Sequence, residues 1–299
     1  MNAFVIDKAN LVKDSKIVQS SILIENNKIS AMKDSFTYYA FMKMRVDPFI
    51  MTPVHVMCDL ELPLKQEFSS LKNYFINEFI SKGCTTILTS FSLQYEYQFL
   101  EKLKEKRTSL LNSPLDYTLG ISVPADLITQ NTVKLCKDHK IPIIWVALDN
   151  IEQLKKIKWG WIKGLLYNYP ITFVPFFTTN IDKKLKMKHL KIWQKMMKNE
   201  RIQHFSDEIQ QKTPLPMEQL KKIGIYPHRG NFIVGGEISY NLYMRKENSS
   251  NEEHSTFKYE DHVLKCTMNK GKCFYSFNQG YFYPGVGEEI IIHTPGYFI

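Results

Sequence analysis

Between residues 51 and 223, short apolar segments alternate with helix-like stretches, and this alternation restricts the fold more than any other feature of the chain. The apolar segments have the length of strands and cover residues 52–57, 85–89, 117–123, 141–148 and 171–177. The stretches with helical periodicity cover residues 69–82, 95–106, 129–139 and 151–157. Near-continuous apolar strands separated by helices are typical of a parallel sheet covered by helices. The middle of the chain therefore predicts an α/β unit with five parallel strands.

The two ends of the chain have β-type sequence instead. Residues 1–50 contain alternating apolar runs, and Asn26-Asn27 between two of these runs tolerates the positive φ of a tight hairpin. Residues 224–299 contain segments of the same kind, interrupted by a polar loop at 247–255. We expect residues 1–50 and 224–299 to form one small β domain, and residues 51–223 to form a separate α/β portion.

Composition excludes several classes of protein. The chain has no apolar run near the roughly 20 residues that a membrane-spanning helix needs, and Asp7 and Asp14 interrupt what would be the apolar part of a secretory signal. Its five cysteines are an odd number without a CxxC pair, which argues against a disulfide framework and a zinc ribbon. We expect a cytoplasmic protein with Cys84 in its core.

Four segments carry a resemblance to a known family. They are SILIENNKI at residues 21–29, FIMTPVHV at 49–56, ISKGCTTI at 80–87, and LKKIGIYPHRGNFIV at 220–234 followed by two glycines. In type, order and spacing they resemble segments of the amidohydrolase superfamily, in particular its dihydroorotase, hydantoinase and dihydropyrimidinase branch. The resemblance implies a TIM-barrel-like parallel α/β unit, together with a small β-sandwich-like domain built from both termini.

The resemblance also implies one or two divalent metals that lower the pKa of a bound water. In the family an HxH pair on the first barrel strand, a lysine on the fourth, two later histidines and an aspartate hold these metals. This chain has Pro53-Val54-His55 at the HxH position, and Trp145 or a neighbour where the lysine would be. Residues 51–223 also fall short of the roughly 250 residues of an eight-stranded barrel. We therefore expect a truncated barrel whose metal site is lost, and no cofactor.

His55, Asp59 and Asp149 are the residues that could form a polar pocket in place of the metal site. Asp59 follows the first of the predicted barrel strands and Asp149 follows the fourth, and barrel sites gather at these carboxyl ends. Each residue also has a structural interpretation: a buried histidine with one hydrogen bond, a turn aspartate, and, with Asn150, an N-cap for the helix from residue 151. The sequence identifies no catalytic residue.

A basic, polar stretch covers residues 181–212 and predicts a long helix or a helix pair. Its buried stripe would contain Leu185, His189, Ile192, Trp193 and Met196. The chain as a whole has a net charge of +9, and Lys183, Lys184, Lys186, Lys188 and Lys191 are the candidates for binding an anion such as a nucleic acid or an anionic surface. The solvated outer face of a packed helix gives the same pattern, so both interpretations stay open.

Three functions follow as hypotheses. The first is an amidohydrolase-like protein without hydrolytic activity that serves as a binding or scaffolding component. The second is a residual hydrolase of C–N bonds in cyclic amides, with a rebuilt site and His55 as its general base. The third is a basic protein that binds a nucleic acid or an anionic surface through residues 183–198. A partial barrel also leaves unpaired sheet edges, so either residues 181–212 or a second copy of the chain must cover them, which predicts a homodimer or a protein partner.

Overall fold

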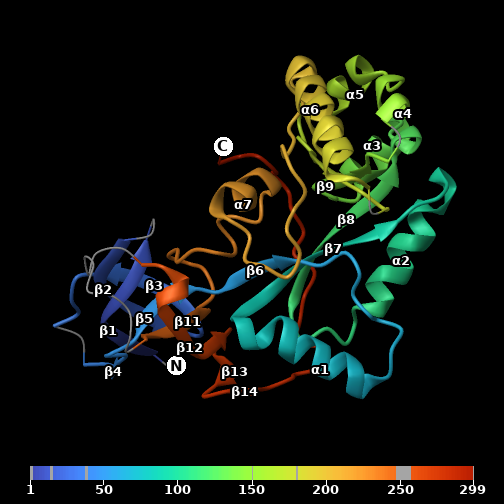
Figure 1. Cartoon of the computed structure of the whole chain (residues 1–299). Coiled ribbons are helices and arrows are strands. Elements are labelled where there is room, and N and C mark those ends of the chain that lie inside the picture. The colour runs from blue at the N-terminus through green and yellow to red at the C-terminus, as the bar shows by residue number, and fades with distance from the viewer. Residues whose placement is uncertain are drawn as a thin grey trace. The chain divides into compact units, whose positions relative to one another are not determined.

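The structure, a computed structural model, describes residues 3–13, 16–37, 40–149, 151–179, 181–246 and 257–298 (Figure 1). The polar loop expected at residues 247–255 and the capping residue Asn150 lie outside these ranges. The chain divides into two compact units, each assembled from three separate segments. Unit 1 comprises Met1–His55, Phe68–Thr85 and Pro227–Phe282, and unit 2 comprises Val56–Glu67, Thr86–Tyr226 and Tyr283–Ile299.

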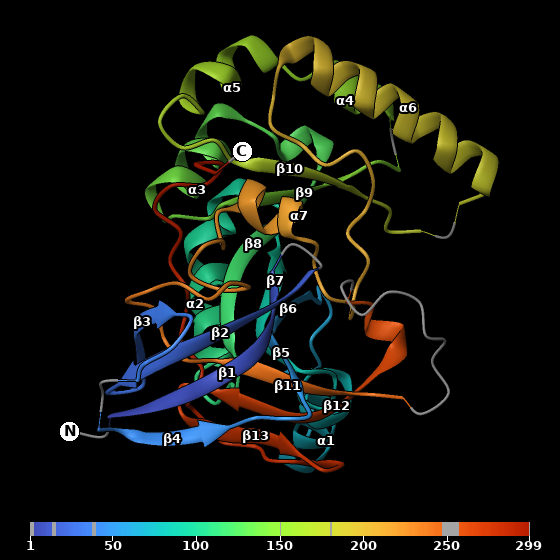
Figure 2. The same ribbon diagram turned by 90° about the vertical axis from the view of Figure 1, so that its left-hand side faces the viewer.

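Unit 1 is built on a mainly antiparallel sheet that contains strands from both ends of the chain (Figure 2). Its strands are β1 (Ala3–Lys13), β2 (Lys16–Glu25), β3 (Lys28–Lys33), β4 (Met42–Arg45), β5 (Ile50–Pro53), β11 (Tyr240–Arg245), β12 (His262–Asn269), β13 (Lys272–Ser276) and β14 (Gln279–Gly280). In the described part of the chain their order is β14-β13-β12-β11-β5-β1-β2-β3, and β4 also pairs with β1. The antiparallel pairing of β11 with β5 joins the two sets. The expected composite β domain is therefore present.

The first hairpin shows how the local sequence determines this sheet. Asn26 and Asn27 have φ values of 52° and 60°, as a two-residue hairpin turn requires, and Glu25 pairs with Lys28 across it. Ile22 and Ile24 are fully buried in the core of the unit. The single helix of more than three residues that we describe in this unit is α1 (Phe68–Glu78).

Unit 2 is built on a parallel sheet with the strand order β10-β9-β8-β7-β6 among the described residues. The strands are β6 (His55–Cys58), β7 (Cys84–Ser92), β8 (Asp116–Pro124), β9 (Ile143–Ala147) and β10 (Thr172–Phe176), and the helices are α2 (Phe99–Ser109), α3 (Gln130–Asp138), α4 (Ile151–Lys155), α5 (Trp159–Leu165), α6 (Lys183–Glu200) and α7 (Met217–Ile223). Successive strands are neighbours in the sheet, as in the first part of a TIM barrel. The sheet curls into half a barrel, which confirms the predicted fold class.

Residues 201–215, here called the crossing segment, cover both edges of this sheet. At the β10 edge the backbone of Phe205 donates to Phe173 at 2.9 Å. At the β6 edge the backbone of Leu215 donates to Val56 at 2.8 Å. Because the chain itself occupies both edges, these edges do not require the second copy or partner that the sequence predicted. Whether the protein forms a homodimer stays a prediction.

The helix predicted over residues 181–212 is shorter than expected. Helix α6 ends at Glu200, and Arg201 takes the left-handed conformation with a φ of 54°. The chain beyond it is irregular because its backbone pairs with strand edges instead of with itself. In the predicted buried stripe, His189 and Trp193 are indeed buried, whereas Leu185 is 42% exposed.

The interior of the half-barrel is an apolar core. The crossing segment and α7 insert side chains into the concave face of the sheet. The core contains Val56, Cys58, Leu88, Ile143, Trp145, Val174, Phe205, Ile209, Leu215, Leu220, Ile223, Ile225 and Ile292. Cys84 is also fully buried, as expected, and none of the five cysteines is in a disulfide. Among the described helices, none combines the length and apolar character that crossing a membrane requires.

The last part of the chain belongs to unit 2, although we expected it in the small β domain. Its backbone pairs with β8, where Tyr117 donates to Glu288 at 2.9 Å and accepts from Ile290 at 2.7 Å. Ile292 is buried in the barrel core. These contacts join residues far apart in the sequence, so the composition of the segment does not reveal them.

Candidate functional site

A cavity of about 280 Å³ lies in unit 2 at the carboxyl ends of β7, β8, β9 and β10. Ligands of parallel barrels and α/β sheets bind at this end of the strands. The lining residues come from the strand ends, from the turn after β6 and from the crossing segment. They are Leu60, Glu61, Ser90, Ser92, Ser122, Trp145, Pro175, Phe176, Phe177, Thr178, Glu208, Ile209 and Gln211.

Three serine hydroxyls form the polar side of this cavity. Ser90 and Ser92 are two residues apart on β7 and therefore face the same side of the sheet. The Ser92 and Ser122 hydroxyls are hydrogen-bonded to each other at 2.8 Å across β7 and β8. In the sequence the only signal of these residues is their polarity at the ends of otherwise apolar strands, and we did not predict them as site residues.

The indole ring of Trp145 forms an apolar wall of the cavity from β9. On the neighbouring strand, Gly120 leaves room for the ring, since a Cβ there would lie 2.3 Å from a Trp145 ring carbon. Trp145 thus occupies the fourth strand of the sheet, where the resemblance implied a lysine. A neutral aromatic ring offers a flat apolar surface, and it has no metal-binding atom.

The crossing segment supplies the opposite wall. The Gln211 side chain accepts a hydrogen bond from the backbone of Leu60 at 3.1 Å. Glu208 forms an ion pair with Lys186 of α6 and accepts a hydrogen bond from the backbone of Phe177 at 3.3 Å. This wall is formed by residues distant in sequence from the strands, so no local motif indicates it.

Asp149 stabilises the loop after β10 and does not line the cavity. Its carboxylate accepts hydrogen bonds from the backbone and hydroxyl groups of both Thr178 and Thr179, at 2.7 to 3.3 Å. Partial burial opposes ionisation, but these hydrogen bonds outweigh it and lower the pKa of Asp149.

Asp59 is buried at the turn that follows β6. Its carboxylate accepts a hydrogen bond from the backbone of Glu61 at 2.9 Å, which orders the turn that brings Glu61 to the cavity. Burial raises the pKa of the neighbouring Cys58 thiol, and the charge of Asp59 adds to this effect. Burial also lowers the pKa of Lys106 to about 8, against the attraction of Asp59. Asp59 therefore orders this turn, and its own side chain does not line the cavity.

His55 belongs to unit 1 and stands at the first residue of β6, at the opposite end of the strand from Asp59. Its Nε2 atom is hydrogen-bonded to the Tyr243 hydroxyl at 2.8 Å, and the Tyr259 ring packs edge-on at 5.0 Å. Burial lowers the pKa of His55 to about 4. The three residues predicted to share a pocket therefore do not line the cavity.

The residues of the cavity do not fit the metal site that the resemblance implied. Within the described ranges, no three His, Cys, Asp or Glu side chains are grouped so that they could hold a metal ion. The carboxylates in the lining belong to Glu61 and Glu208, and Glu208 is already paired with Lys186. Catalytic zinc sites take three protein ligands, usually including histidine.

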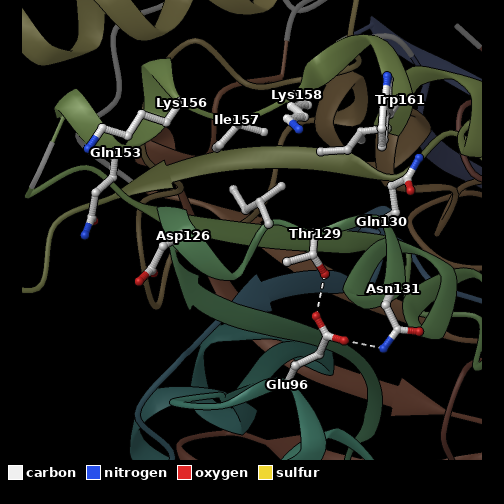
Figure 3. Close-up of a pocket in the computed structure, with 12 residues that line it drawn as sticks. Glu96, Asp126, Thr129, Gln130, Asn131, Gln153, Lys156, Ile157, Lys158 and Trp161 are labelled. Carbon is white, nitrogen blue, oxygen red and sulfur yellow. Dashed lines mark hydrogen bonds between the residues drawn. The ribbon is translucent and has the colours of Figure 1, made fainter.

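A second cavity in unit 2, of about 530 Å³, lies outside the sheet between α3 and the α4–α5 region (Figure 3). At its base, the Glu96 carboxylate accepts hydrogen bonds from Thr129 and Asn131. These bonds hold the carboxylate at the start of α3 and, with partial burial acting against them, lower the pKa of Glu96. None of the site residues that we predicted from the sequence lines this second cavity.

The fold has clear relatives among solved structures, although no protein-family model and no curated protein matches the sequence. A D-hydantoinase matches with a TM-score of 0.65 at 10% identity, over 97% of this chain and 99% of the other. The dihydropyrimidinase from Brevibacillus agri NCHU1002 matches with a TM-score of 0.59 at 10% identity, over 98% and 99%. The L-hydantoinase (dihydropyrimidinase) from Arthrobacter aurescens matches with 0.55 at 11% identity, over 97% and 100%. The chain has the fold of the hydantoinases and dihydropyrimidinases of the amidohydrolase superfamily.

Proposed function

We propose that this chain is a non-catalytic binding protein that holds a small, uncharged polar ligand in the cavity at the carboxyl ends of β7 to β10. The observation that carries the proposal is the composition of the lining. Hydroxyl groups and an aromatic ring take the place of imidazole, lysine and clustered carboxylate ligands. The cavity keeps the position of a barrel site and has a different chemistry.

The lining favours a flat ligand with both donors and acceptors of hydrogen bonds. The Ser90 hydroxyl is buried at the cavity, and Trp145 offers a face for stacking. No lysine or arginine belongs to the lining, so an anionic ligand would lack a counter-charge there. Cyclic amides fit these requirements, and the names of the structural relatives indicate ligands of this class.

The lining supports binding rather than hydrolysis. Nucleophilic catalysis by serine needs an adjacent general base, and the nearest partner of the Ser92 hydroxyl is the Ser122 hydroxyl. No histidine lines the cavity. His55, the base of the residual-hydrolase hypothesis, is buried against Tyr243 in unit 1 with a pKa of about 4.

Calorimetric titration with hydantoin and dihydrouracil tests the proposal. We expect measurable binding to the full chain and no ring opening during prolonged incubation. Ser90→Ala should weaken binding about threefold to tenfold, because one hydrogen bond contributes about 0.5–1.5 kcal/mol. Ser109→Ala on the exposed side of α2 is the matched control and should change nothing.

A variant whose new side chain fills the cavity gives a sharper test of the proposal. Ser90→Phe should abolish binding while the far-ultraviolet circular dichroism spectrum stays that of the wild type. Binding that survives in this variant places the ligand elsewhere and contradicts the proposal. Ring opening at a rate that scales with protein concentration would contradict the non-catalytic function.

A further inference from the structure

Helix α6 separates its apolar and basic residues onto opposite faces. His189, Trp193 and Met197 recur every four residues and are buried. The indole of Trp193 donates to the backbone of Phe205 at 2.8 Å, and the His189 ring is hydrogen-bonded to the backbone of Leu148 at 2.8 Å. These contacts fix the rotation of the helix on unit 2 and therefore determine which face is solvent-exposed.

Five lysines form a row on the exposed face. Lys184, Lys188, Lys191, Lys195 and Lys198 follow at intervals of four, three, four and three residues, and all five are exposed. This spacing keeps side chains on one face of a helix, with neighbours about 5–6 Å apart. At about 1.5 Å per residue, the row extends for about 21 Å. We call it the lysine row.

The charge of the lysine row is uncompensated. None of its ammonium groups forms an ion pair with a residue that the structure describes. Lys186 differs, since it pairs with Glu208 and lies over the Phe177 ring at 5.1 Å. Like charges three or four residues apart destabilise a helix by about 0.2–0.5 kcal/mol per pair. A row of such pairs therefore lowers the stability of the helix.

We propose that the lysine row binds the phosphodiester backbone of a polynucleotide, independently of base sequence. Phosphates of one strand of a duplex advance about 3.4 Å each along the axis, so the length of the row matches about six of them. Helix α6 lies on the outside of unit 2 (Figure 2), and all five lysines of the row are exposed. No aromatic side chain lies in the row, so it lacks the stacking groups that engage bases.

An anionic bilayer is the alternative partner, and the structure favours it less. A helix that lies in a membrane interface inserts its apolar face among the lipids. In α6 this face is occupied, because Trp193 and Met197 are fully buried in unit 2. A bilayer is also a surface, which a single line of charges engages only in part, whereas a polynucleotide backbone is itself a line.

Fluorescence anisotropy of the full chain with a 20-base-pair DNA duplex of mixed sequence, measured over a range of salt concentrations, tests the proposal. Five phosphate contacts predict a slope of log K against log salt of about −4.5 for a duplex, and about −3.5 for single-stranded oligothymidylate. The double variant Lys191→Gln/Lys195→Gln should flatten the duplex slope by about 1.8.

Lys134→Gln/Lys163→Gln is the matched control, since it removes the same charge from exposed positions on α3 and α5. This control should leave the slope within about 0.5 of the wild type, on the order of half a contact. An equal effect of both double variants would assign binding to net charge and overturn the proposal. No binding to either nucleic acid overturns it too. So does binding only to phosphatidylserine vesicles, which would assign the row to a membrane.

Discussion

At the scale of single residues, Gly120 determines how the aromatic wall of the cavity packs. A Cβ at this position would lie 2.3 Å from the Trp145 ring and 2.5 Å from the Ile143 side chain. We therefore expect Gly120→Ala to destabilise the protein by about 1–3 kcal/mol through overpacking. Urea denaturation measures the free energy of unfolding directly.

Gly164→Ala in α5 is the control for that substitution. An added Cβ there meets no atom within 4 Å, and alanine is the better helix former. We expect this variant to be more stable by about 0.5–1 kcal/mol. If Gly120→Ala were as stable as Gly164→Ala, the close approach of Trp145 to β8 would be contradicted.

His55 gives the stability of the protein a specific dependence on pH. Burial lowers its pKa from 6.5 to about 4, so between these values the unfolded chain binds a proton that the native state does not. Stability is therefore lost as the pH falls through this window. From pH 7 to pH 5 the loss attributable to His55 is about 2 kcal/mol.

His55→Gln should remove this part of the pH dependence while exposed His228→Gln should leave it unchanged. Chemical denaturation of the three proteins at pH 7 and pH 5 makes the comparison. A wild-type profile in the His55→Gln variant would show that another group is responsible.

At the scale of elements, the crossing segment replaces the second half of a barrel as the cover of the sheet interior. Ile209 is buried in this segment, where it contributes both to the apolar core and to the cavity wall. We expect Ile209→Ala to cost about 2–5 kcal/mol of stability, because it leaves a cavity beneath the sheet. Met187→Ala, at a position that is 53% exposed on α6, is the control. If Ile209→Ala and Met187→Ala were equally stable, the crossing segment would not contribute to the stability of the apolar core.

Most strands and helices between residues 52 and 177 were predictable because their periodicity is local, although helix α5 was not predicted. Each predicted strand and helix between residues 52 and 177 has a counterpart within a few residues. The crossing segment was not predictable as such, since its backbone bonds go to strands that are far away in the sequence. A helical pattern continued into it only because apolar side chains recur there at similar spacing.

The predicted pocket residues show the same limit. The segment around His55 resembles a first barrel strand, yet His55 stands at the amino end of β6. The turn at the carboxyl end contains Asp59 and Glu61 instead. A resemblance in sequence does not determine which end of a short strand a side chain occupies. The serines of the cavity were not predicted as site residues because they belong to no motif.

At the scale of the whole molecule, both units are assembled from segments distant in the chain. The prediction of a homodimer relied on open edges at β6 and β10, and the crossing segment covers both. Sedimentation velocity at micromolar concentration decides the oligomeric state. A dimer would have to form through another surface, because those two edges are occupied.

The central claim is that a barrel site persists as a binding cavity without its metal chemistry. Metal content per chain, measured by mass spectrometry after expression with zinc and manganese and purification without chelators, tests it most directly. We expect far less than one divalent metal per chain, because Ser90, Ser122 and Trp145 line the cavity and the lining contains no histidine. A stoichiometric metal that is retained through dialysis would contradict the account.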